Sequence, residues 1–211
     1  ALLDKQFAKK LAGHIDPARR KPLPNAFTPG SDTVYLTVVD RDRMAVSLIN
    51  SLYGAFGVGV CTEKTGIMLQ NRGACFVVEP GHPNCVGPRK RPMHTIIPAL
   101  GMRDGRCELS FGVMGGSYQA MGHAWFISNL IDYGMDVQAA IDLARLFFEG
   151  QQTVVERGVS ATTTAGLKSR GHDVAVRAMP LGGGQAIGID WRRGVLTGGS
   201  DPRKDGCAVG F

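Results

Sequence analysis

The spacing of apolar positions along the chain predicts four helices and eight strands. Leu3, Phe7, Leu11 and Ile15 recur at near-helical intervals with lysines between them, which predicts a helix over residues 2–16. Further amphipathic patterns predict helices from about Ser117 to Tyr133, over residues 136–148 and over residues 160–170. The predicted strands are Thr33–Asp40, Met44–Asn50, Gly66–Asn71, Thr95–Leu100, Glu108–Val113, Asp173–Arg177, Gln185–Asp190 and Val195–Thr197.

The order of these elements is strands, then helices, then strands, without a regular βαβ alternation. This order predicts an α+β fold in which helices cover an antiparallel sheet system, rather than a doubly wound parallel sheet. The chain has 211 residues, which is enough to bury one sizeable core. No apolar run approaches the roughly 18 residues of a membrane span, so a membrane protein is not expected.

The first 32 residues differ in character from the rest. Asp16-Pro17 ends the predicted first helix, and a stretch rich in proline and basic residues continues to Gly30, which is typical of an exposed connector. An accessible segment leading into a strand is what a proteolytic cleavage site requires. The opening residues lack the basic-then-apolar order of a signal peptide, and the chain is expected to be a piece of a longer protein.

Charge and cysteine usage exclude several classes of function. The net charge is +6, and residues 1–32 contribute six Lys/Arg against three Asp/Glu, but no stripe of basic and aromatic residues indicates nucleic-acid binding. The five cysteines lack CxxC spacing, so neither a disulfide framework nor a zinc site is expected. Most are expected to be small buried residues in a reducing compartment, the cytoplasm rather than the periplasm. The histidines are scattered, so no metal or other cofactor is expected.

Thr33 is the candidate nucleophile. A threonine hydroxyl is a weak nucleophile that needs a base, and an α-amine with a pKa of about 7.7–8.0 can serve once the residue is N-terminal. Cleavage of the bond between Asp32 and Thr33 would therefore create the active form. Ser51 and Thr37 are candidates to orient the hydroxyl. The backbone N–H groups of Gly115-Gly116 could stabilise an oxyanion, although a Gly-Gly pair between a strand and a helix is also a common steric requirement.

Eight short motifs follow one another in a fixed order between Thr33 and Phe211. They are Thr33…Val38-Val39-Asp40, Ala45-Val46-Ser47, Phe56-Gly57, Gly66-Ile67, Lys90-Arg91-Pro92, Gly115-Gly116-Ser117, Ile131-Asp132-Tyr133-Gly134 and Ser200-Asp201-Pro202-Arg203. In this order they resemble the small catalytic subunit of the γ-glutamyltranspeptidase family of N-terminal-nucleophile hydrolases. Residues 1–32 then resemble the tail of the large subunit with the linker to the cleavage site, and residues 33–211 the catalytic portion.

The resemblance implies a four-layer αββα fold and self-cleavage between Asp32 and Thr33 by an N-to-O acyl shift. It implies catalysis through an acyl-enzyme ester on Thr33, which water or an amine acceptor resolves. Ser51 falls where the family has a hydroxyl bonded to the nucleophile, and Gly115 and Gly116 fall on the oxyanion-hole pair. The implied partners are a large subunit from the same precursor, in a heterodimer or a dimer of heterodimers, and a small-molecule amide substrate, with neither nucleic acid nor membrane.

The substrate-binding positions depart from the family pattern. Typical members bind the α-amino group of a γ-glutamyl unit with an asparagine, a glutamine and an aspartate, which match Tyr53, Arg72 and Cys75 here. The family's paired serines match His94 and Thr95. Arginine is suited to carboxylates and repels a cation. Two interpretations of Arg72 stay open, a substrate contact and a structural ion pair with an acidic residue, and His94 could be a proton carrier or a hydrogen-bonding prop.

The sequence therefore predicts an autoprocessing threonine hydrolase, similar to glutathione hydrolases and γ-glutamyltransferases. An alternative within this class is hydrolysis of a small acidic amide without a free α-amine, as in the oxamate-hydrolysing and glutaryl-acylase-like relatives. The alternative from another class is a non-catalytic relative that acts as a binding or scaffold protein. Retention of Thr33, Ser51 and the Gly115-Gly116 pair counts against it.

Overall fold

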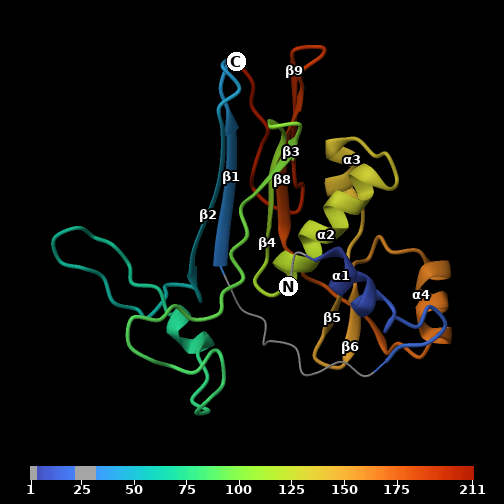
Figure 1. Ribbon diagram of the computed structural model, residues 1–211, viewed down its shortest axis with the longest axis horizontal. Coiled ribbons are helices and arrows are strands. Elements are labelled where there is room, and N and C mark those ends of the chain that lie inside the picture. Colours follow the sequence, from blue (N-terminus) through green and yellow to red (C-terminus); the bar gives the residue numbers. More distant parts are fainter. Residues whose placement is uncertain (1–3, 22–31) are drawn as a thin grey trace. The chain divides into compact units, whose positions relative to one another are not determined.

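The computed structural model describes residues 4–21 and 32–211, for Asp32 the backbone only, and the chain divides into two compact units (Figure 1). One unit comprises Pro29–Leu143 and Pro180–Phe211, and it contains every predicted catalytic and substrate-binding residue. The other comprises Ala1–Thr28 and Ala144–Met179. No helix among the described residues is long and apolar enough to cross a membrane.

Two antiparallel sheets form the unit that holds the predicted site. Its elements are β1 (Asp32–Val39), β2 (Ala45–Tyr53), the 3-10 turn η1 (Arg72–Cys75), β3 (Ala99–Arg103), β4 (Arg106–Met114), α2 (Tyr118–Ile131), α3 (Val137–Asp142), β8 (Gly183–Asp190) and β9 (Val195–Ser200). Strands β1 and β2 pair as a hairpin, and the second sheet has the strand order β3-β4-β8-β9.

Alternation along β4 defines the layers of this unit. Gly112 lies against β1, since a Cβ on it would come within 2.3 Å of the Tyr35 ring. The neighbouring Phe111 points to the opposite face, where its ring lies 5.3 Å from that of Phe126 in α2. Successive residues of a strand point to opposite faces, so the four-stranded sheet lies between the hairpin and the helices. The fold is α+β, as the element order predicts.

The core of the unit lies between the four-stranded sheet and the two helices. A Cβ on Gly199 of β9 would come within 2.8 Å of Val137 and 2.9 Å of Ile141, so α3 packs directly on the strand backbone. The side chain of Asp136 caps this helix by accepting the Ala139 N–H at 2.8 Å. The buried apolar residues of the unit are Tyr35, Phe111, Val113, Tyr118, Phe126, Val137, Ala140, Ile141, Leu181, Ala186 and Ile189.

The other unit combines α1 (Lys5–Ala12), β5 (Leu146–Glu149), β6 (Gln152–Val155), α4 (Ala161–Ser169) and β7 (Val174–Val176). Strand β6 lies centrally, antiparallel to β5 and parallel to β7. Val154 and Val155 of β6 supply buried apolar side chains. The apolar residues that predict α1 remain outside the core, since Leu11 is 53% exposed.

Several predicted elements differ in the structure. Gly66–Asn71 is not a strand and contributes only an isolated bridge between Met68 and Cys61. The strand predicted from Thr95 begins at Ala99, because Pro98 has no N–H to donate to a ladder. The helix predicted over 136–148 ends at Asp142, and residues 146–149 form β5. Strand β6 was not predicted at all. Residues 22–31, which include most of the predicted connector, lie outside the described part of the chain.

Candidate active site

Thr33 begins the site as the second residue of β1, where it is only 6% exposed. In the hairpin register it faces Ser51 of β2, and the Thr33 hydroxyl donates to Ser51 Oγ at 3.1 Å. Directly opposed residues of an antiparallel pair project on the same face, so the hairpin itself fixes this hydroxyl pair. The structure thus brings together the predicted nucleophile and one of its predicted orienting partners.

Ser51 Oγ is a meeting point for two further donors. The backbone N–H of Tyr53 donates to it at 2.9 Å, and Nη2 of Arg72 donates to it at 3.0 Å. A guanidinium thus lies one hydroxyl away from the Thr33 oxygen. Hydrogen bonds from charged donors are stronger than those from neutral ones, so Arg72 contributes the strongest of these contacts.

Arg72 is buried, with 7% exposure, in the turn η1 that follows the glycine-rich segment. Its Cζ lies 5.0 Å from the centre of the Tyr53 ring, within the range of a cation–π contact. Nη1 is buried and has no hydrogen-bond partner, and no carboxylate among the described side chains pairs with the guanidinium. A structural ion pair with an acidic residue therefore does not explain the burial of Arg72.

Tyr53 occupies an uncommon backbone conformation beside the nucleophile. Its φ of 76° lies in the left-handed region, which bulky residues rarely adopt outside constrained sites. This turn directs the Tyr53 N–H at Ser51. A hydrogen bond with the Cys75 side chain and then burial raise the pKa of the Tyr53 hydroxyl above its usual value, and the positive charge of Arg72 opposes them. Tyr53, Arg72 and Cys75 therefore form one cluster.

The Gly115-Gly116 pair lies between the end of β4 and the start of α2. Both residues have positive φ, at 131° and 59°, and a Cβ on Gly115 would come within 2.6 Å of Gly182 Cα. Close backbone packing thus requires glycine at position 115. Neither N–H donates to a described residue, which leaves both as available donors at a helix start.

The way β1 packs on β4 indicates that Gly115 and Gly116 lie at the same end of the two sheets as Thr33. Thr37 Oγ1 contacts Ser110 Oγ at 2.5 Å, and Tyr35 packs on Gly112. Continuing this alignment by two residues predicts that Thr33 lies level with Met114, which immediately precedes Gly115. The start of β1 and the junction of β4 with α2 lie at the same end of this unit (Figure 1).

Thr37 does not orient the nucleophile, and this prediction is wrong. Its hydroxyl contacts Ser110 Oγ at 2.5 Å and donates to the carbonyl oxygen of Val46 at 3.1 Å. Four residues of extended strand, about 13 Å, separate it from Thr33. Thr37 instead joins the hairpin to β4.

The predicted substrate residues His94 and Thr95 lie in the segment before β3. His94 is exposed and forms no hydrogen bond with a described residue, so it is not a hydrogen-bonding prop there. Thr95 is half-buried, and its Oγ1 is buried without a partner. Asn84, which the sequence patterns did not single out, donates to the Cys75 carbonyl at 2.6 Å and accepts the Met93 N–H at 2.8 Å. Asparagine in a Pro/Gly-rich loop is the signal that could have found it.

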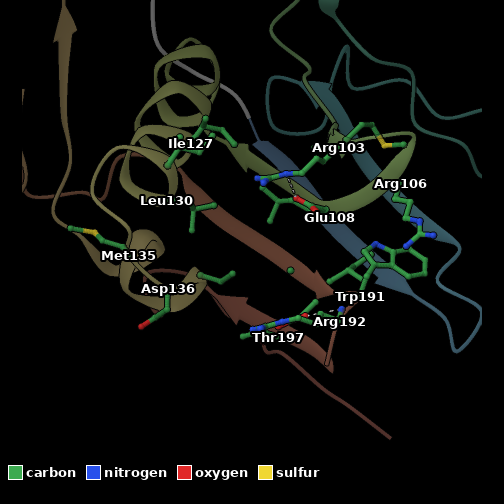
Figure 2. Close-up of a pocket in the computed structure, with 18 residues that line it drawn as sticks. Arg103, Arg106, Glu108, Ile127, Leu130, Met135, Asp136, Trp191, Arg192 and Thr197 are labelled. Carbon is green, nitrogen blue, oxygen red and sulfur yellow. Dashed lines mark hydrogen bonds and ion pairs between the residues drawn. The ribbon is translucent and has the colours of Figure 1, made fainter. Parts of the chain in front are cut away.

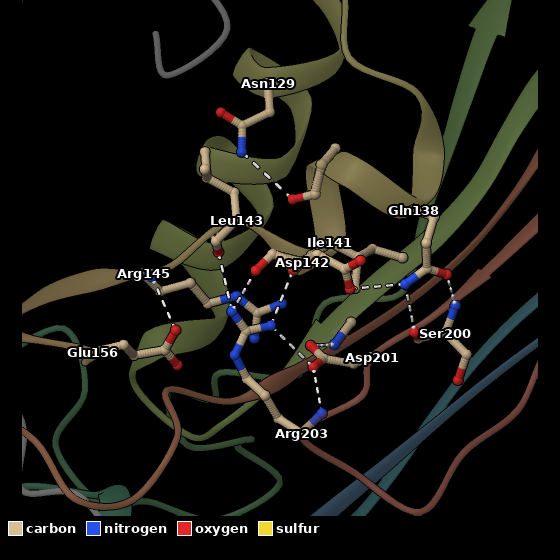
Figure 3. A network of polar contacts seen from close by, with 12 residues as sticks. Asn129, Gln138, Ile141, Asp142, Leu143, Arg145, Glu156, Ser200, Asp201 and Arg203 are labelled. Carbon is tan, nitrogen blue, oxygen red and sulfur yellow. Dashed lines mark hydrogen bonds and ion pairs between the residues drawn. The ribbon is translucent and has the colours of Figure 1, made fainter. Parts of the chain in front are cut away.

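The Ser200–Arg203 motif forms a network of polar contacts with the end of α3 (Figure 3). Asp201 is fully buried and accepts the Gly184 N–H at 2.8 Å and Nη1 of Arg203 at 3.1 Å. Arg203 also donates to three carbonyl oxygens at the end of α3, those of Ile141, Asp142 and Leu143. Since the adjacent Gly183 pairs with Met114, this network supports the backbone next to Gly115.

The cysteines are less buried than predicted. All five are free, but Cys61 and Cys207 are exposed and the other three are half-buried. The expectation that most are core residues is therefore wrong. Cys75 instead lies in the cluster with Tyr53.

A groove of about 850 Å³ lies elsewhere in the same unit, between α2 and strands β3, β4, β8 and β9 (Figure 2). Arg103 pairs with Glu108 at 2.9 Å on its rim, and Arg106 lies 5.5 Å from the Trp191 ring. None of the predicted catalytic or substrate-binding residues lines it.

Comparison with known proteins agrees with the geometry. The family model described as gamma-glutamyltranspeptidase matches residues 1–211. The chain is 41% identical to the glutathione hydrolase-like YwrD proenzyme of Bacillus subtilis (strain 168), over 100% of this chain and 41% of that protein. It is 36% identical to the oxamate amidohydrolase proenzyme of Klebsiella pneumoniae, again over 100% of this chain and 41% of the relative.

The chain is also similar to a solved structure. The cephalosporin acylase from Bacillus halodurans superposes with a TM-score of 0.87 at 39% identity, over 97% of this chain and 38% of that one. The chain thus spans about two fifths of the length of these relatives.

The fold and the comparisons define the class as an N-terminal-nucleophile hydrolase of α+β architecture. Within this class, the chain belongs to the γ-glutamyltranspeptidase family.

Proposed function

We propose that the full-length protein is a proenzyme that cleaves itself before Thr33 and then hydrolyses amides with Thr33 as nucleophile. The observation that carries the proposal is the hydroxyl pair of buried Thr33 and half-buried Ser51, at 3.1 Å, at the end of the β1–β2 hairpin away from its turn. The relatives that match the whole chain are themselves named proenzymes, one a glutathione hydrolase-like protein and one an oxamate amidohydrolase.

Self-cleavage begins with attack of Thr33 Oγ1 on the carbonyl carbon of Asp32. The new C–O bond replaces the C–N bond, and the hydroxyl proton goes to the Thr33 nitrogen, which becomes an amine. Water then hydrolyses the ester, releasing the Asp32 carboxylate and the free N-terminal threonine. From this point the α-amine can act as the base for Thr33.

Turnover repeats the chemistry on an external amide. Thr33 Oγ1 attacks the substrate carbonyl, and the N–H groups of Gly115 and Gly116 stabilise the oxyanion. The amine leaves with a proton, and water or an amine acceptor resolves the acyl-enzyme. The proposed substrates are γ-glutamyl or related amides. The proposed partner is a large subunit from the same precursor, in a heterodimer or a dimer of heterodimers, and the cytoplasm remains the predicted location.

The test is the intact mass of the full-length protein after purification and incubation. We expect two fragments, the second beginning at Thr33, in the wild type and in Thr33→Ser, which keeps a hydroxyl. Thr33→Ala should stay a single chain. A wild-type chain that stays intact, or a Thr33→Ala chain that is cut at the same bond, would contradict the proposal, and the first result would favour a non-catalytic binding or scaffold protein.

Arg72 favours a second candidate, the hydrolysis of acidic amides that lack a free α-amine. A buried guanidinium without a carboxylate partner suits an anionic or neutral oxygen and disfavours an ammonium group. Glutaryl anilide and γ-glutamyl anilide form a matched pair, because they differ only in the α-ammonium group. We expect kcat/KM to be about tenfold higher for glutaryl anilide than for γ-glutamyl anilide. Arg72→Gln should lower this ratio of the two kcat/KM values. Preference for the γ-glutamyl compound in both proteins would rule this candidate out.

A further inference from the structure

Self-cleavage lacks the base that turnover has. While Asp32 and Thr33 are joined, the Thr33 nitrogen is an amide and cannot accept the hydroxyl proton as a base does. Activation of Thr33 Oγ1 in the uncut chain therefore needs other groups around the hydroxyl. The described contacts lead from Thr33 Oγ1 to Ser51 Oγ at 3.1 Å and from there to Arg72 Nη2 at 3.0 Å.

We propose that Arg72 is a positioning residue for self-cleavage, acting through Ser51 on the Thr33 hydroxyl. Its guanidinium holds the Ser51 oxygen in place and, through it, stabilises the negative charge that develops on Thr33 Oγ1 during attack. This inference rests on the proposed function, in which Thr33 cuts the preceding bond. It adds a role that precedes any external substrate.

The environment of Arg72 leaves part of its positive charge without a hydrogen-bond acceptor. A buried cation is stabilised when an anion or a set of acceptors meets it, and a cation without one is costly. The guanidinium is 7% exposed, and Nη1 has no acceptor. No described carboxylate pairs with it. Negative charge that develops at Thr33 during self-cleavage can meet this guanidinium through Ser51.

The turn around Arg72 is held rigidly enough for this role. The preceding residue, Asn71, donates its N–H to the Leu52 carbonyl at 3.0 Å and accepts the Gly54 N–H at 2.8 Å. Both contacts tie the turn to the end of β2, where Tyr53 stacks on the guanidinium. A preorganised donor needs no reorganisation when charge develops, which is the condition for efficient electrostatic stabilisation.

Arg72 gives up no proton in this step. The Thr33 hydroxyl proton ends on the Thr33 nitrogen as the C–N bond breaks, so atoms and charge balance without a co-reactant. The guanidinium keeps its charge throughout, as arginine side chains do in proteins. Its contribution is electrostatic and geometric.

The test is the rate of self-cleavage in the full-length precursor. We expect Arg72→Ala and Arg72→Gln to slow cleavage by about 10- to 100-fold, and Arg72→Lys to recover part of the loss because it keeps the charge. Millimolar guanidinium should accelerate Arg72→Ala, whereas urea, which has a similar shape without the charge, should not. Arg106→Gln is the matched control, since Arg106 also stacks on an aromatic ring, that of Trp191.

Cleavage of Arg72→Ala or Arg72→Gln at the wild-type rate would overturn the inference. Equal rescue by urea and guanidinium, or no rescue by guanidinium and no gain in Arg72→Lys over Arg72→Gln, would also overturn it, because the role would then be structural. If the wild type is not cut, or Thr33→Ala is, the proposed function itself fails. The two failures are therefore distinguishable in the same gel and mass measurements.

Discussion

Single atoms decide the chemistry of this site, and Ser51 Oγ is the atom on which most contacts meet. It contacts the Thr33 hydroxyl, the Tyr53 N–H and the Arg72 guanidinium within 3.1 Å. The sequence named Ser51 and Thr37 as candidate partners of Thr33, and the family resemblance pointed to Ser51. The residues alone could not distinguish the two, because only the hairpin register shows that Ser51 faces Thr33, whereas Thr37 lies about 13 Å from Thr33 along the strand.

Removal of the shared oxygen should affect both chemistry and stability. In Ser51→Ala, the buried Arg72 Nη2 and the Tyr53 N–H lose their acceptor, which should cost about 1–3 kcal/mol of unfolding free energy. Self-cleavage should slow by about 10- to 100-fold. Ser51→Thr keeps a hydroxyl and is the control, expected to retain most of both properties. Chemical denaturation and cleavage time courses measure the two effects, and an unchanged cleavage rate in Ser51→Ala would refute the role of Ser51.

At the scale of elements, the strongly patterned segments were predictable and the loops between β2 and β3 were not. Helix α2 begins and ends within two residues of its predicted bounds, because a strand, a Gly-Gly pair and a long amphipathic run mark it. Residues 146–149 form a strand because pairing with β6 outweighs a helical pattern that sequence alone leaves ambiguous. The segment from 54 to 98 gives little periodicity, so its pattern did not indicate the Asn71 contacts, and only the Pro/Gly-rich loop around Asn84 marks that residue.

Helix α2 also carries a buried histidine that should make stability depend on pH. Burial lowers the pKa of His123 below its usual 6.5, while its contacts with the Gln119 and Ile97 backbone act in the opposite direction. Below about pH 6.5 the unfolded chain therefore binds more protons at this site than the folded one, and unfolding free energy should fall as the pH drops.

His123→Phe keeps an aromatic ring beside Phe111 and removes this titration. We expect the loss of unfolding free energy between neutral and mildly acidic pH to be smaller in His123→Phe than in the wild type. The exposed His14→Gln is the control. Denaturant titrations across this pH range measure the effect, and parallel pH profiles for wild type and His123→Phe would contradict it.

At the scale of the whole molecule, the chain spans about 41% of the length of its B. subtilis relative. Its hairpin has one face on the four-stranded sheet and an outer face of apolar side chains. Val34, Leu36 and Val38 are 61%, 46% and 53% exposed there. Apolar patches of this kind mark interaction surfaces. We predict that the proposed large subunit packs on this outer face. The sequence alone could not show which face of the hairpin stays exposed, because apolar side chains occur on both of its faces.

A charge on this face should therefore disturb assembly. We predict that Leu36→Lys lowers the yield of soluble full-length protein and loosens the association of the two cleavage products, measured by size-exclusion chromatography. Val78→Lys, at a position 86% exposed outside the hairpin, is the control and should behave as the wild type. A wild-type elution profile for Leu36→Lys would show that nothing covers this face.

Mass spectrometry of the cleaved enzyme quenched with acid during turnover tests the central claim most directly. With glutaryl or γ-glutamyl anilide as substrate, the acyl group should be found on the peptide that begins at Thr33, attached through the hydroxyl as an ester. An acyl group on Ser51 or Cys75 instead, or turnover by the Thr33→Ala protein at the wild-type rate, would contradict the assignment of Thr33 as the nucleophile.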